Sequence, residues 1–184
     1  MVDRSRKAFI PPFSIKAMPN KITLLNDERI QYEGVFDLSE LYKHAHSWLA
    51  WRKFDVEEKK YTEKLKAAGK EFEIKWEASK NLDEYSKFQL EIRFHLLGIN
   101  EEQVKKDTHI AKMQKGEINI FVSAHLITDR QDYWGQSVTY SFLRGFYDRY
   151  IYRSSFERLK GELWKIGWDF FNEMKSFLNL YKFG

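Results

Sequence analysis

The spacing of hydrophobic residues changes twice along the chain, which predicts helical segments on either side of a β-rich centre. Between residues 38 and 52, apolar residues recur every three or four positions, as expected for one face of a helix. Asp37 is followed three residues later by Glu40, a capping-box pattern that marks a helix start. We therefore predict a strand over 29–36 and an amphipathic helix over about 38–52.

Apolar and polar residues alternate through three segments of the middle third: 70–79, 87–97 and 117–127. Successive side chains of a strand point to opposite faces, so alternation predicts an antiparallel sheet with one buried face. Two further strands are expected near 56–65 and 104–113. The stretches "AAGK" and "QKGE" are predicted to form hairpin turns. Together with the strand over 29–36, these segments predict a sheet of about six strands.

The helical spacing returns near residue 138 and predicts one helix over about 138–153 and a final helix over about 155–181. Ser154 and Glu157 form a second capping-box pattern between the two helices. The final helix is the only predicted element long and apolar enough to cover the sheet. We therefore predict an α+β fold: a curved antiparallel sheet of about six strands, gripped by a long C-terminal helix.

The domain organisation is expected to be simple, because 184 residues suit one domain. All three prolines lie at or before Pro19, and proline favours extended backbone. Residues 1–20 are predicted to form an extended basic arm, and residues 21–184 a single α+β domain.

The order of predicted elements, together with the segment "IQYEGVFDLSELYKHAHSWLAW", resembles the START and polyketide-cyclase-like superfamily with its helix-grip fold. The helix expected near 138–153 departs from that pattern. The resemblance implies an apolar cavity between sheet and C-terminal helix that holds a lipid, a sterol or another apolar molecule. The predicted ligand-binding residues are Trp76, Phe88, Phe94, Trp168 and Phe171. The alternative is that these aromatic rings fill the core completely.

The composition favours a non-catalytic protein. The chain has no cysteine, which excludes disulfides, thiolate nucleophiles and cysteine-based metal sites. It also has no nucleophile elbow, zinc-protease motif, phosphate-binding loop or dinucleotide fingerprint. Asp129, Arg130 and Asp132 suit an ordinary charged loop as well as a catalytic one. No cofactor or metal is predicted, and a cyclase-type enzyme remains a third hypothesis.

His95 and His125 both fall on the polar side of predicted strands, with Glu73 and Glu91 nearby in the pattern. An open, carboxylate-assisted metal site there is weighed against ordinary solvent-facing residues, and the second interpretation is favoured.

A cluster of basic and tyrosine residues in "RGFYDRYIYRSSFERLK" supports a second hypothesis. The chain has 31 basic and 27 acidic residues and a net charge of +4, with both signs mixed along most of its length. In this segment, however, basic residues outnumber acidic ones. The alternative function is an adaptor for an anionic partner, namely a nucleic acid, a membrane surface or a protein. The predicted anion-binding residues are Arg144, Arg149, Arg153, Arg158 and Lys160.

A second aromatic stripe on the final helix, which includes Trp164, Trp168 and Phe171, is left over once one sheet is covered. It is compatible with a contact to the preceding helix, with the lining of a cavity or with a homodimer contact. No apolar run reaches the roughly 18 residues needed to span a membrane. The first residues also lack the apolar core of a secretory signal. We therefore expect a cytoplasmic protein without a transmembrane segment.

Overall fold

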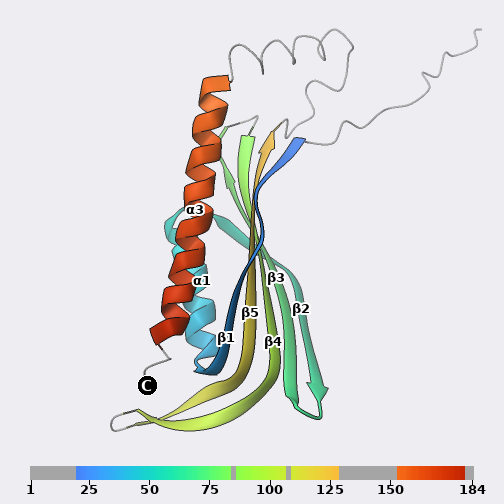
Figure 1. Cartoon of the computed structure of the whole chain (residues 1–184), viewed down its shortest axis with the longest axis vertical. Coiled ribbons are helices and arrows are strands. Elements are labelled where there is room, and N and C mark those ends of the chain that lie inside the picture. Colours follow the sequence, from blue (N-terminus) through green and yellow to red (C-terminus); the bar gives the residue numbers. More distant parts are fainter. Residues whose placement is uncertain (1–19, 84–85, 107–108, 129–152, 181–184) are drawn as a thin grey trace, which may run out of the picture.

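The computed structural model describes residues 20–83, 86–106, 109–128 and 153–180, which form an antiparallel sheet with helices on one of its faces (Figure 1). The five strands lie in the order β1-β5-β4-β3-β2, so β1 and β2 are the two edges. The elements are β1 (Asn20–Phe36), α1 (Leu38–Trp51), β2 (Asp55–Lys66), β3 (Gly69–Asn81), β4 (Ser86–Lys106), β5 (His109–Thr128) and α3 (Arg153–Leu180). The predicted α+β class, antiparallel sheet and C-terminal helix are confirmed.

The first helix begins where the sequence predicts. The Asp37 side chain accepts a hydrogen bond of 2.9 Å from the Glu40 backbone N–H, which satisfies a donor that the helix itself leaves free. The backbone N–H of Leu38 donates to Gln114 Oε1 on β5 at 2.9 Å. This second bond ties the start of α1 to the sheet.

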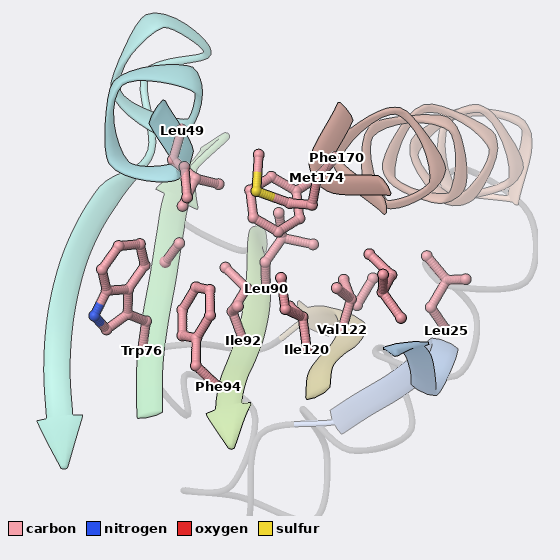
Figure 2. Packing of buried hydrophobic residues seen from close by; sticks show 14 of the residues in the cluster. Leu25, Leu49, Trp76, Leu90, Ile92, Phe94, Ile120, Val122, Phe170 and Met174 are labelled. Carbon is pink, nitrogen blue, oxygen red and sulfur yellow. The ribbon is translucent and has the colours of Figure 1, made fainter. Parts of the chain in front are cut away.

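Two helices share the cover of the apolar sheet face. The long helix α3 lies over β1 and β5, and α1 lies beside α3 on the side of β2 (Figure 2). Side chains from both helices point toward those of the sheet, as Phe170 and Leu49 do in Figure 2. The face of α3 that meets the sheet includes Leu163, Phe170 and Met174, which are all fully buried.

The first strand is longer than predicted because its N-terminal half breaks the alternation. Its register with β5 shifts between Thr23 and Leu25 and again between Leu25 and Glu28. Such bulges move side chains from one face to the other, and Asp27 adopts a positive φ of 55° between them. A pattern with a strict period of two therefore finds only the regular part, after Glu28.

The prediction of about six strands is wrong for the described residues, which form five. The expected strand over 104–113 is not separate, because its first residues end β4 and its last residues begin β5. β4 and β5 remain paired as far as Lys106 and His109. The chain reverses between those two residues and not at "QKGE", whose Gly116 lies inside β5. A Cβ at Gly116 would come within 2.8 Å of the Leu97 carbonyl oxygen, so glycine here allows a close approach of two backbones.

The other predicted turn is confirmed, since Lys66 pairs with Gly69 across the β2–β3 hairpin. The predicted arm lies outside the described residues apart from Asn20, which begins β1. The helix expected over 138–153 also lies outside them, apart from Arg153, which begins α3.

Candidate ligand groove

Three of the five predicted ligand-binding residues lie in the packed core. Trp76, Phe88 and Phe94 are fully buried. The Trp76 ring meets Phe94 edge-on with centroids 5.1 Å apart, and Tyr42 of α1 packs on Trp76 at 4.5 Å. Trp76 and Phe94 lie between β3, β4 and α1, and none of the three rings lines a groove described below.

The other two predicted residues lie together on α3. Trp168 contacts Phe171 with ring centroids 5.2 Å apart, and Trp164 continues the row at 6.1 Å from Trp168. They occupy the side of α3 away from α1, which instead meets Asp169 and Glu173 through Arg52 and His44. The structure therefore divides the five predicted residues between two places.

An apolar groove lies elsewhere, between the start of α1 and the β2–β3 hairpin. It consists of two adjoining hollows of about 290 and 300 Å³ that share Leu38, Phe72 and Gln114. We call it the Phe72 groove. The first hollow also contains Ser39, Tyr42, Lys43, Tyr61 and Ile74, and the second Leu65, Gly69, Lys70, Ile99, Asn100 and Glu101.

The groove exists because the hairpin extends past the first turn of α1 (Figure 1). The apolar face of β2 and β3 is uncovered there, so Tyr61 is 54% exposed and Leu65 82% exposed. Phe72 is half-buried between them, with its ring 6.3 Å from that of Tyr61. Exposed apolar side chains gathered around a hollow are typical of a surface that binds something.

Polar groups at the rim are of two kinds. Tyr42 donates a hydrogen bond of 2.7 Å to Glu58 Oε2, and burial together with this carboxylate raises the Tyr42 pKa to about 12. The phenol is thus a fixed, neutral donor. Lys43 is exposed and forms no ion pair with any described residue, whereas Lys70 is 2.8 Å from Glu63. Lys43 is therefore a cation at the rim that a ligand can reach.

The opposite face of the sheet carries a network of ion pairs around Glu91. Its carboxylate oxygens lie 2.8 Å from Lys21 Nζ, 3.0 Å from Lys75 Nζ and 3.4 Å from His125 Nε2. Burial opposes ionisation of Glu91, but hydrogen bonds from the two lysines outweigh it and lower its pKa to about 2. The network cross-links β1, β3, β4 and β5.

The two histidines considered for a metal site do not meet. His125 lies beside Glu91, whereas His95 pairs with Asn119 in register and lies 4.0 Å from Glu73. Asn119 and His125 are six positions apart along β5, a distance of roughly 20 Å at the rise of a strand. Among the described residues, no group of three His, Asp or Glu side chains is placed to hold a metal ion.

Most of the predicted anion-binding surface lies outside the described residues, as do Asp129, Arg130 and Asp132. This is true of Arg144 and Arg149 and of the side chain of Arg153. Arg158 is exposed, and Lys160 Nζ lies 2.8 Å from Glu157 and 4.7 Å from the centre of the Phe156 ring. The anionic-partner hypothesis therefore stays a prediction.

Comparison of the chain with protein-family models, with curated proteins and with solved structures found no match. In the part of the chain that the structure describes, no helix is both long and apolar enough to cross a membrane.

The sequence contained the groove residues but no signal that they form a site. Phe72 and Ile74 belong to the alternating set that predicts burial. Tyr61 and Leu65 are isolated apolar residues in a highly charged strand. Only the position of α1 over the sheet determines which of them remain uncovered.

Proposed function

We propose that this protein binds an amphipathic small molecule in the Phe72 groove and performs no chemistry on it. The observation that carries the proposal is the exposure of Tyr61 and Leu65 around the half-buried Phe72. Burying each such side chain against a ligand contributes about 1.5–3 kcal/mol. The groove therefore gains most from a ligand with a substantial apolar part.

The shape and charge of the groove narrow the ligand class. The two hollows adjoin along Leu38 and Phe72, so they suit an elongated apolar body. Lys43 and the Ser39 hydroxyl line the first hollow, where an acidic group of the ligand would be accepted. A long-chain carboxylate has both features.

Binding without catalysis fits the lining of the groove. It contains no histidine, and its one carboxylate, Glu101, is exposed and unlike a buried general acid or base. In this proposal the buried Trp76, Phe88 and Phe94 do not touch the ligand. The closed cavity implied by the START-like resemblance, with the helix-grip arrangement, remains a separate prediction.

Titration with a fluorescent fatty acid, cis-parinaric acid, tests the proposal. Leu65→Asp should weaken binding about tenfold, because it places a charge where the apolar body lies. Leu97→Asp is a matched control, since Leu97 is also an exposed strand residue, at 41%, but lies on the other face of the sheet. Equal affinities for the two variants, or no binding by the unmodified chain, would disprove the proposal.

A further inference from the structure

The outer edge of β1 is open in the part of the chain that the structure describes. β1 pairs with β5 on one side, and no described strand pairs on the other. From Glu28 to Phe36 its register with β5 runs without a shift. A long regular edge presents a row of free backbone donors and acceptors, which is a template for another strand.

The other edge of the sheet differs in a way that discourages pairing. β2 places Glu58 and Glu63 opposite Trp76 and Phe72, on the apolar face. Its register also shifts between Glu58 and Lys60. Inward-facing charges and bulges are devices that protect an edge strand. From Arg29 to Phe36 β1 has neither, since Ile30 and Tyr32 are its buried inward residues. The inward-facing charge of Glu28, opposite Val122, lies only at the start of the regular pairing.

A groove of about 500 Å³ follows the open edge between β1 and the C-terminal half of α3, two elements that contact each other. β1 contributes the residues from Arg29 to Glu33, and α3 contributes Phe171, Lys175, Leu178 and Asn179. An added strand would occupy this groove. Phe171 would then contact it from above.

The charged residues of β1 are complementary to those of a second β1 strand that runs antiparallel to it. Glu33 is exposed, faces Glu117 as its partner in register, and forms no ion pair with any described residue. A like charge directly opposite is unfavourable. Arg29, Gln31 and Glu33 are spaced two residues apart, so all three lie on the same face of β1, with Gln31 midway between the two charged residues. An antiparallel pairing of two β1 strands centred on Gln31 therefore sets Arg29 of each copy opposite Glu33 of the other.

Neighbouring registers lack this match. Moving the centre one residue toward the N-terminus sets Asp27 opposite Glu33, two acidic side chains. Moving it one residue toward the C-terminus sets Arg29 opposite Val35 and leaves Glu33 opposite Gln31. Within its own chain, Arg29 donates to Asn119 Oδ1 at 2.9 and 2.7 Å and lies 3.8 Å from Glu117 Oε1. Only the register centred on Gln31 sets an arginine opposite Glu33, and it does so twice because of the two-fold symmetry.

We propose that a second copy of this chain docks on β1 in that register, so that one sheet continues through a two-fold homodimer. The dimer axis passes between the two Gln31 residues. The α3 helices of both copies then lie on the same side of the joined sheet, with their Phe171 faces toward the axis. The Phe72 groove lies at the opposite edge of each sheet and stays open, so this inference is independent of the proposed function.

A cysteine cross-link tests the register directly. The chain has no cysteine, so Gln31→Cys introduces a single thiol on an exposed side chain. Residues directly opposite in an antiparallel pair have Cα atoms about 4.5 or 5.5 Å apart, within the range of a disulfide. Mild oxidation of the full chain should give a disulfide-linked dimer. Thr62→Cys on β2 is the matched control and should remain unlinked.

Charge reversal tests the pairing of Arg29 with Glu33 through sedimentation equilibrium. Glu33→Arg should raise the dimer dissociation constant roughly tenfold, and the exchange of both residues, Arg29→Glu with Glu33→Arg, should restore most of the loss. Glu57→Arg on β2 should have no effect. Circular dichroism establishes that each variant is folded. A monomeric unmodified chain at 100 µM (about the highest concentration needed for a weak dimer), or equal cross-linking at positions 31 and 62, would overturn the proposal.

Discussion

Gly167 of α3 lies directly against Leu25 of β1, so closely that a Cβ atom at position 167 would overlap Leu25 Cδ1. The same Cβ would lie 3.4 Å from Ala124 Cβ on β5. This contact sets how near α3 approaches the two strands that it covers. Since Leu25 is itself buried, its side chain has little room to move aside.

Alanine substitutions of two glycines in α3 should therefore act in opposite directions. Gly161 has no atom within 4 Å of its would-be Cβ, so Gly161→Ala should raise the free energy of unfolding by about 1 kcal/mol through helix propensity. Gly167→Ala gains the same propensity but overfills the core, which costs about 1–3 kcal/mol. Urea denaturation of the two variants should show Gly167→Ala as the less stable one. Equal stabilisation by both would mean that the helix is not held against Leu25.

The ion pairs of Glu91 should make the fold sensitive to acid. Its pKa is lowered to about 2 in the folded protein from an ordinary value of 4.5, so its stabilising contribution is complete above pH 4.5. That contribution is lost as the pH falls from 4.5 toward 2, because protonation releases Lys21 and Lys75. Glu91→Gln should remove about 2 kcal/mol at pH 7 and flatten the acid limb of a stability-against-pH curve. An unchanged acid limb would contradict the assignment.

His125 should titrate below its usual range. Burial lowers its pKa from 6.5, the charge on Lys21 lowers it further, and the nearby Glu91 partly opposes the shift. A buried neutral histidine favours the folded state above pH 6.5, and this contribution is lost as the pH falls through and below that value. NMR titration of the ring protons should give a lowered pKa, and Glu91→Gln should lower it further. A pKa that rises in this variant would show that Glu91 does not act on the ring.

Lys43 should distinguish acidic from neutral ligands of the Phe72 groove. Lys43→Ala should weaken binding of a long-chain carboxylate about threefold to tenfold, since an exposed ion pair contributes about 1 kcal/mol or less and a better-desolvated one somewhat more. The corresponding alcohol should bind both proteins equally well. Competition against cis-parinaric acid provides the measurement. The exposed Lys53, which does not line the groove, offers Lys53→Ala as a control.

The periodicity of the chain predicted the faces of the elements well. Phe88, Leu90, Ile92 and Phe94 alternate in the sequence and are all buried on one sheet face. Asp37 and the apolar spacing after it located α1 to within one residue. These features depend on local rules, because successive strand residues point to opposite faces and a capping side chain bonds a backbone N–H three residues away.

Other features depend on residues that are distant in the sequence. Gly116 suggested a turn, but it allows a close approach to the β4 backbone from within a strand. Trp76 and Phe94 were predicted to bind a ligand; in the structure their rings contact each other, and Tyr42 of α1 packs on Trp76. A pattern in one segment cannot reveal which other segment will cover it.

The sequence by itself thus determined the α+β class, the bounds of α1 and the buried face of each regular strand. Tertiary structure alone decided which strands became the edges and how far the helices reach across that face, which leaves Tyr61 and Leu65 uncovered. The physical reason is that periodicity records which side of an element avoids water. The partner that excludes the water is chosen by packing between distant segments.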